Sequence, residues 1–326
     1  MTRLRIGIAG VGAIASHFHL PILQASPLCE LAGLAEADPL RLSSLTTIAP
    51  KIPAFPSWQA LLAEVQLDAL VVCLPPQHHL ACGLAAIAKG LAVYMEKPLT
   101  LTLEEARQLT AAASQTQQPC MTGFNFRFHP AISEMKAQCQ AGHIGQLLAV
   151  RGTFTTPKSR QPGWRKSAGS GASALLDLAV HHVDLFRFLT GEEVTYANAV
   201  EHDGGSRALL QLRSTTGVLF DGFFAQGVAE DFRLELIGDK GQLTFTRHLQ
   251  AKPAFRAGHH IWTRAQKIHR ALHALHPENL RYGPGHEPSF ALALAAFLTA
   301  ASNKTTIKPD FSDGLRAQQV LEDALQ

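Results

Sequence analysis

The apolar positions in the first third of the chain form short, continuous runs separated by helical stretches. The runs read LRIGIAG (4–10), LAGLAEA (31–37), DALVVCLPP (68–76) and LAVYMEKP (91–98). Helical patterns occupy segments between them, among others 13–25, 77–89 and 103–117. Continuous apolar strands that alternate with helices are typical of a parallel sheet covered on both faces. The chain up to about residue 124 is therefore predicted to form a doubly wound α/β domain.

A different pattern follows about residue 145, where strands are joined by tight Thr-Gly and Asp-Lys-Gly turns. These strands lie within GQLLAVRGTFT (145–155), RALLQLRSTTGVLFDGFF (207–224) and FRLELIGDKGQLTFTR (232–247). Short connections join antiparallel neighbours. We therefore predict two domains, 1–124 with the doubly wound parallel sheet and 125–326 with an α+β fold built on a large, mainly antiparallel sheet. Helices are expected near 129–140, 172–190 and 312–326, and the last of them can pack back on the first domain.

Length and composition support a two-domain globular protein. At 326 residues the chain exceeds the ~250–300 residues at which single cores usually stop growing. A hydrophobic fraction of 46% and a charged fraction of 17% argue against a mainly disordered chain. The net charge of +3 gives no reason to expect nucleic-acid binding. No stretch reaches the ~18–20 apolar residues of a membrane span, so a membrane role is not expected.

The cysteines do not indicate a disulfide framework or a zinc site. They are odd in number and form no C-x-x-C pair: Cys29, Cys73, Cys82, Cys120 and Cys139. The first residues also lack the long apolar core of a secretory signal. We therefore expect a reducing, cytoplasmic setting and no bound metal.

The first strand runs directly into a glycine turn that opens a helix. The turn has the form G-x-G-x-x-A and reads Gly10-Val11-Gly12-Ala13-Ile14-Ala15. Gly10 permits the tight turn, Gly12 lets the backbone approach a pyrophosphate, and the small Ala15 lets helix and strand pack closely. With a strand before it and a helix after it, the turn predicts dinucleotide binding, with Ala13 and Ile14 beside the cofactor.

An acid at the end of the second strand is the other half of this motif. Glu36 lies 24 residues after Gly12, where a carboxylate can accept hydrogen bonds from the adenosine ribose. A carboxylate there repels a 2′-phosphate, and no Arg or Lys follows before Arg41, so the sequence favours NAD and leaves NADP possible. Asp38 is the competing acid, but Asp38-Pro39 has the form of a helix start.

Two more strand ends lie along the same predicted crevice, because ligands bind at the carboxyl ends of strands in open parallel sheets. The third strand is followed by Pro75 and, after a short turn, by His79; both are cofactor candidates. The alternative for His79 is a residue in the first turn of a helix. The fourth strand ends in Glu96 and Lys97, which are also cofactor candidates; such charges are costly at a buried strand tip unless they have partners or a function. The alternative for Glu96 is that it only balances the charge of Lys97.

A second polar cluster occurs in SGASALLDLAVHHVDLFRFLTG (170–191), which has a helical apolar pattern. Asp177 and His181 are spaced i, i+4, so on a helix they share one face. The alternative is an aspartate that holds a helix histidine for packing reasons alone.

These motifs occur together in one order: the glycine turn, the Glu-Lys-Pro strand end, GFNFRFHP (123–130) and D-x-A-x-H-H-x-x-D. In this respect the chain resembles the glucose-fructose oxidoreductase, inositol dehydrogenase and rhizopine catabolism family (Gfo/Idh/MocA). The resemblance implies a Rossmann domain, a substrate domain, a nicotinamide cofactor, a homodimer or homotetramer, and chemistry on a sugar-like hydroxyl or ketone. The chain departs from the family pattern in the small-residue run 169–174 and at Ala179, where the family usually has a glycine.

The resemblance also assigns roles. Lys97 of the Glu-Lys-Pro motif, with a cis Lys97-Pro98 bond, and the pair Asp177 and His181 match the family's catalytic residues. Hydride transfer to or from an alcohol carbon requires a group that takes or supplies the hydroxyl proton. We assign Lys97 and His181 to that proton relay and Asp177 to orienting the substrate or the histidine. Which of the two is the immediate proton acceptor stays open.

Four further residues are candidates for contacts with sugar hydroxyls or for stacking: Asn125, Arg127, Trp164 and His182. Their alternatives are, in turn, a helix start, a surface cation, a core aromatic residue and a core or surface histidine. Tyr282 is a weaker candidate of the same kind.

A basic amphipathic helix is predicted within 258–277. Packing on its own domain, binding a phosphorylated or nucleotide-linked substrate, an oligomer contact and a membrane-surface role are its alternatives. For the whole chain, the leading hypothesis is an NAD(P)-dependent oxidoreductase acting on a sugar, cyclitol or related polyhydroxy compound. A reductase of another ring substrate, such as biliverdin or a dihydrodiol, and a noncatalytic dinucleotide-binding regulator are the alternatives.

Overall fold

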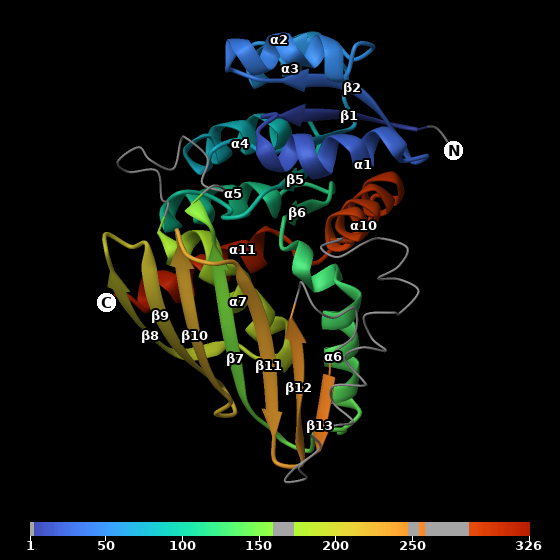
Figure 1. Cartoon of the computed structure of the whole chain (residues 1–326). Coiled ribbons are helices and arrows are strands. Elements are labelled where there is room, and N and C mark those ends of the chain that lie inside the picture. The colour runs from blue at the N-terminus through green and yellow to red at the C-terminus, as the bar shows by residue number, and fades with distance from the viewer. Residues whose placement is uncertain (1–2, 159–172, 247–253, 258–286) are drawn as a thin grey trace. The chain divides into compact units, whose positions relative to one another are not determined.

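The structure is a computed structural model of the 326-residue chain, and it describes residues 3–158, 173–246, 254–257 and 287–326 (Figure 1). Two compact units contain these residues. Unit one comprises the described residues of 1–124 and 290–319, and unit two those of 125–161, 172–289 and 320–326. No helix in the described segments has the length and apolar character that crossing a membrane requires.

Unit one is built on a parallel sheet. Among the described residues it has six strands in the order β3-β2-β1-β4-β5-β6. Their bounds are β1 Leu4–Ala9, β2 Cys29–Ala35, β3 Ala54–Phe55, β4 Ala69–Val72, β5 Ala92–Met95 and β6 Cys120–Thr122. The central strands β4 and β5 are buried at every position, which explains their continuous apolar sequence. The predicted doubly wound parallel fold is confirmed.

Helices connect these strands and pack on the sheet. They are η1 Ala15–His19, α1 Leu20–Ala25, α2 Pro39–Ile48, α3 Trp58–Glu64, η2 Pro76–His78, α4 His79–Ala88 and α5 Leu103–Ala113. Asp38 caps α2, because its side chain accepts hydrogen bonds from the backbone amides of Leu40 and Arg41. The prediction that Asp38-Pro39 starts a helix is confirmed.

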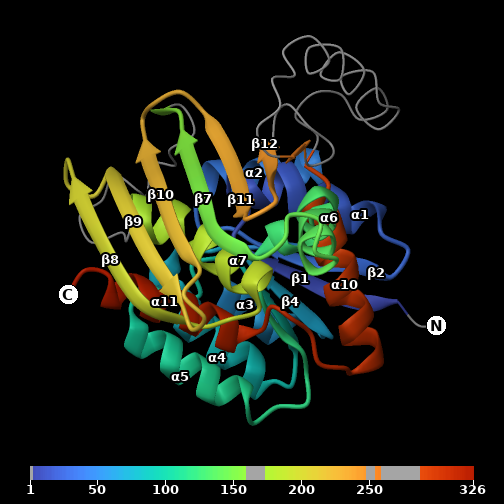
Figure 2. The same ribbon diagram turned by 90° about the horizontal axis from the view of Figure 1, so that it is seen from below.

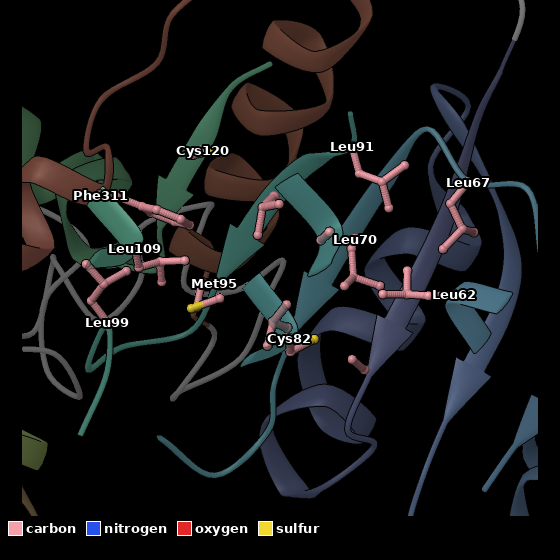
Figure 3. Packing of buried hydrophobic residues seen from close by; sticks show 14 of the residues in the cluster. Leu62, Leu67, Leu70, Cys82, Leu91, Met95, Leu99, Leu109, Cys120 and Phe311 are labelled. Carbon is pink, nitrogen blue, oxygen red and sulfur yellow. The ribbon is translucent and has the colours of Figure 1, made fainter. Parts of the chain in front are cut away.

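The end of the chain completes unit one. It forms α10 Ser289–Asn303 and α11 Phe311–Asp323. Phe311 is 1% exposed and belongs to the same hydrophobic cluster as Leu99, Leu109 and Cys120 (Figure 3). Gln318 adds a reciprocal pair of hydrogen bonds with the backbone of Thr100. Sequence-distant segments therefore share one core.

Unit two contains the second sheet. In the part of the chain that the structure describes, it has seven strands in the order β13-β12-β11-β7-β10-β9-β8. Their bounds are β7 Leu147–Thr156, β8 Val194–His202, β9 Arg207–Ser214, β10 Leu219–Gln226, β11 Asp231–Gly238, β12 Gly241–Thr246 and β13 Ala254–Ala257. Figure 2 shows β8, β9, β10, β7 and β11 side by side. The predicted mainly antiparallel sheet is confirmed.

One pair of strands departs from a simple meander. β7 and β10 run parallel, while the other neighbours are antiparallel. A parallel pair needs a long crossover, and more than sixty residues separate the two strands in sequence. The short helices of unit two are η3 Asn125–Phe128, α6 Pro130–Gln140, the π-helical turn η6 Leu175–Ala179 and α7 Val180–Thr190. The sheet alternates strictly between buried and exposed positions in β9, so one of its faces is open.

Candidate active site

The glycine turn lies between β1 and η1 in unit one. Gly10 has φ +89°, and a Cβ atom there would come within 2.7 Å of the Cys73 carbonyl oxygen, so no other residue fits without strain. Around Gly12, no atom lies within 4 Å of the place that a Cβ would take. Ala13 and Ile14 are exposed, while Ala15 is fully buried against the sheet. The turn therefore leaves backbone open toward space, as a pyrophosphate requires.

Glu36 follows β2 directly and is 5% exposed. Its carboxylate accepts a hydrogen bond from the Val11 amide at 2.9 Å, so the acid is tied to the glycine turn. It also accepts from the Asp38 amide at 2.9 Å and from the Arg41 guanidinium at 3.1 Å. The structure thus brings the predicted acid, the predicted turn and the first downstream cation together.

The segment after β4 contains Pro75 and His79. His79 is the first residue of α4 and 1% exposed. Its Nδ1 lies 3.1 Å from the carbonyl oxygens of both Pro98 and Leu99, and its Nε2 lies 2.8 Å from that of Leu74. Burial lowers the pKa of the imidazole, although these carbonyls act in the opposite direction. The structure favours the alternative in which His79 belongs to the first turn of a helix, because its ring nitrogens face backbone carbonyl groups.

The Glu-Lys-Pro segment follows β5. The Lys97-Pro98 bond is cis, as the family resemblance implied, and Lys97 is half-buried. Glu96 is 9% exposed, and its carboxylate lies 2.7 Å from Nε2 of His19 in η1. Burial, assisted by the Glu96 charge, raises the pKa of Cys73 and of Tyr94 well above their ordinary values. Glu96 therefore has a specific partner that the sequence did not reveal.

Asp177 and His181 lie in unit two, on consecutive turns where η6 passes into α7. Each residue is 6% exposed. The Asp177 carboxylate accepts a hydrogen bond of 3.2 Å from the side-chain amide of Gln226. The His181 ring packs 4.8 Å from the ring of Phe126, measured between centroids. Gln226 was not predicted; the available signal was a polar residue ending the apolar strand LFDGFFAQ, the same signal that marked Lys97.

His182 lies in the core of unit two. It is fully buried among phenylalanine rings, with centroids 5.1 Å from Phe224 and 5.0 Å from Phe232. Gly152 leaves room for it, since a Cβ there would overlap the imidazole. Burial lowers the pKa of His182 to about 4. These contacts favour the core-histidine alternative over a substrate contact.

Arg127 and Asn125 hold η3 in place. The Arg127 guanidinium makes two hydrogen bonds, of 2.9 and 2.6 Å, with the carboxylate of Asp184, whose side chain is 1% exposed. The surface-cation alternative is therefore wrong for Arg127. Asn125 donates a hydrogen bond of 2.6 Å to the Ser289 hydroxyl and is 2% exposed.

Some sequence candidates lie outside the described residues. These are Trp164, most of the small-residue run 169–174, the basic segment 258–277 and Tyr282.

Comparison with known proteins places both units in one family. Residues 4–124 match a model described as an oxidoreductase family with an NAD-binding Rossmann fold, and residues 132–244 match the GFO/IDH/MocA C-terminal domain. The chain belongs to the Gfo/Idh/MocA family. The predicted family, the oxidoreductase class and the NAD-binding first unit are thereby confirmed.

Gfo/Idh/MocA relatives match along nearly the whole chain. The dTDP-3,4-didehydro-2,6-dideoxy-alpha-D-glucose 3-reductase of Actinomadura kijaniata is 28% identical, over 99% of this chain and 95% of the relative. The inositol 2-dehydrogenase of Rhizobium meliloti is 24% identical, over 99% and 96%. A mutant of a 3-ketoreductase from Actinomadura kijaniata, crystallised with TDP-benzene and NADP, superimposes with a TM-score of 0.82. It is 25% identical, with 98% and 96% of the two chains covered.

Proposed function

We propose that this protein is an NAD-dependent oxidoreductase that interconverts a hydroxyl group and a ketone on a sugar, cyclitol or related polyhydroxy ring. The proposal rests on the polar residues that the structure describes at the strand end of unit one and on the helix of unit two. Lys97 follows β5 in the same unit as the dinucleotide turn, and Asp177 and His181 lie on successive helical turns in unit two. Relatives named as a dTDP-sugar 3-reductase and an inositol 2-dehydrogenase support a ring that carries hydroxyl groups.

The residues of unit one fit a bound dinucleotide. The open backbone at Gly12 would hold the pyrophosphate, and the Glu36 carboxylate would accept hydrogen bonds from ribose hydroxyls. The Glu36 carboxylate would repel a 2′-phosphate, which favours NAD over NADP. The nicotinamide would supply or accept the hydride.

Proton transfer is assigned to Lys97 and His181. A second proton-transferring side chain beside the lysine would help the proton to leave. His181 is such a group, and Asp177 would orient it or the substrate. Of the remaining substrate candidates, the buried ion pair of Arg127 and the buried amide of Asn125 support a role in shaping η3, and Trp164 stays a prediction.

A homo-oligomer is part of the proposal, and the open face of the second sheet is the surface for it. Val200, Leu209 and Phe223 form one register row across β8, β9 and β10 and are 60, 55 and 41% exposed. A contiguous apolar row of this kind is typical of interaction surfaces. Its proposed occupant is the same face of a second copy of this chain.

A cytoplasmic location is also proposed. All five cysteines are free, and burial raises the pKa of the Cys82 and Cys120 thiols to about 12. Thiols with such a high pKa stay protonated and unreactive at neutral pH. Free cysteines of this kind fit a reducing compartment.

The proposed function is tested with a panel of sugars, cyclitols and nucleotide-linked sugars, each with NAD and with NADP, followed by reduced-nicotinamide absorbance. We expect turnover of at least one polyhydroxy ring, with NAD preferred. Lys97→Ala should lower kcat by about 10²–10⁴-fold because the proton relay is lost. The same variant should keep its NAD affinity.

Lys89→Ala, at an exposed lysine of the same unit, is the matched control and should keep full activity. Turnover confined to biliverdin or a dihydrodiol would replace the polyol assignment with the alternative ring reductase. NAD binding without turnover of any compound would instead indicate a noncatalytic regulator. Near-wild-type kcat in Lys97→Ala would contradict the relay.

A further inference from the structure

Two buried histidines in unit one contact the chain on either side of Lys97 in sequence. His19, from η1, is fully buried and reaches Glu96, which lies 77 positions later in the sequence. His79, from α4, reaches the carbonyl oxygens of Pro98 and Leu99. Lys97 is the residue that these two sets of contacts enclose.

The contact between His19 and Glu96 buries a carboxylate, and the loss of hydration is unfavourable unless other interactions or a function compensate for it. A carboxylate that is 9% exposed loses most of its hydration, and the Nε2 of His19 at 2.7 Å is the side-chain hydrogen-bond partner that the described residues give it. The imidazole is itself confined by the rings of Tyr94 and Phe290, with centroids 5.4 and 5.6 Å away. The carboxylate is therefore held in one place by a ring that cannot turn freely.

The contacts of His79 hold the residues that follow Lys97. Its two ring nitrogens face carbonyl oxygens in two different segments, Leu74 after β4 and Pro98 with Leu99 after β5. The ring therefore lies between two neighbouring strand ends, and as a neutral imidazole with one N–H it donates from one of its nitrogens. With 1% exposure it is not a surface that a ligand can contact.

We propose that His19 and His79 are positioning residues that clamp the Glu-Lys-Pro segment and thereby fix the direction of the Lys97 side chain. The inference rests on the proposed role of Lys97. His19 is the last residue of η1, the short helix that follows the glycine turn, so the clamp also joins the dinucleotide turn to the segment of the catalytic lysine. Such positioning matters because small displacements of a reacting group reduce rates strongly.

The chain supplies its own matched controls. His17 lies two residues before His19 in the same helix, and His78 precedes His79; both are exposed. The test compares His19→Phe and His79→Phe, which remove the polar contacts, with His17→Phe and His78→Phe. His19→Gln and Glu96→Gln are included because an amide still allows a hydrogen bond between positions 19 and 96. Circular dichroism checks that each variant folds.

We expect His19→Phe and His79→Phe to lower kcat by ~10-fold or more, with NAD affinity close to that of the wild type. His19→Gln and Glu96→Gln should retain more of kcat than His19→Phe, and the two control variants should match the wild type. A second readout needs no substrate: amine-reactive labelling of Lys97, quantified by peptide mass spectrometry against the exposed Lys51 and Lys89. The labelling rate of Lys97 should change in both Phe variants and in neither control.

The two proposals fail in different ways. If the wild-type protein turns over no compound of the panel, the proposed function is lost, and the labelling still decides the clamp. If Lys97 labels at the wild-type rate in His19→Phe and His79→Phe, or if kcat falls no further than in the controls, the clamp is wrong. Should a Phe variant not fold, the alanine variant at the same position replaces it, with the same two readouts and the same contradicting outcome.

Discussion

At the scale of single residues, two adjacent histidines on one helix differ in their chemistry because different side chains surround them. His181 and His182 are adjacent in α7, and both are largely shielded from solvent. Both rings pack against phenylalanines, but His182 lies among Phe224 and Phe232 in the core, whereas His181 contacts Phe126 and lies one helical turn from Asp177. A sequence shows that two histidines are adjacent, but not which of them faces the sheet.

The low pKa of His182 makes a prediction about stability. In the folded chain this pKa is about 4, and in the unfolded chain it is near the ordinary 6.5. Between these values the unfolded state binds a proton that the folded state does not. The contribution of His182 to the free energy of unfolding is therefore complete above pH 6.5 and falls by about 3 kcal/mol as the pH drops to 4.

Urea denaturation at several pH values checks this prediction. His182→Leu should lose less stability than the wild type on acidification, because it has no imidazole to protonate. His143→Leu, at an exposed histidine, should follow the wild-type pH dependence. Parallel pH curves for the wild type and His182→Leu would contradict the assignment.

Residue types with a fixed backbone requirement could be predicted from the sequence. Gly10, Asp38 and the cis Lys97-Pro98 bond lie where the motif or the family resemblance placed them. The partners of His19, His79 and Asp177 could not be predicted. Each of these contacts joins positions that are distant in sequence, and the direction of a buried side chain depends on the packing of both elements.

At the scale of elements, the end of β10 supports the π-helical turn η6. Gln226 is the last residue of β10, and its amide donates to the Asp177 carboxylate. Gln226→Leu keeps the approximate shape but removes the donor from a largely buried carboxylate. We expect the free energy of unfolding to fall by about 1–3 kcal/mol, measured by urea denaturation.

Gln211→Leu is the control for this change, because Gln211 lies on the open face of the neighbouring strand β9. It should alter stability by no more than about 0.5 kcal/mol. Under the proposed function, Gln226→Leu should also lower kcat, whereas Gln211→Leu should not. Equal stability of the two variants would show that the hydrogen bond to Asp177 contributes nothing.

Element types were predictable where the apolar pattern had one period and a clear boundary. Strands β1, β2, β4 and β5 and the helix after Asp38 follow this rule, whereas the two- and three-residue strands β3 and β6 were not predicted. The parallel pairing of β7 with β10 could not be read from the chain, because pairing across more than sixty residues depends on what fills the crossover. The π-helical start of the segment 175–190 is also invisible in an apolar pattern that suits an α-helix equally well.

At the scale of the whole molecule, the open sheet face predicts self-association. Phe223→Lys places a charge at the β10 end of the apolar row Val200, Leu209 and Phe223. We expect this variant to give a smaller species than the wild type in size-exclusion chromatography with light scattering. Burying an unpaired lysine against a second copy is unfavourable.

Ile48→Lys tests whether any exposed apolar residue has the same effect. Ile48 is 55% exposed on α2 of unit one, far from the second sheet in sequence, and its replacement should leave the elution unchanged. A monomeric wild-type protein, or identical elution of Phe223→Lys and wild type, would remove the proposed oligomer.

The placement of Phe311 has a consequence for how the protein is made. Its ring, donated by α11, fills the core between α5 and the β-sheet of unit one, and Thr122 and Thr100 also hydrogen-bond to this late segment. Unit one therefore cannot complete its core while the ribosome is still translating unit two. During synthesis, the dinucleotide-binding fold therefore keeps an unfilled apolar gap until Phe311 and the segment after it have been made.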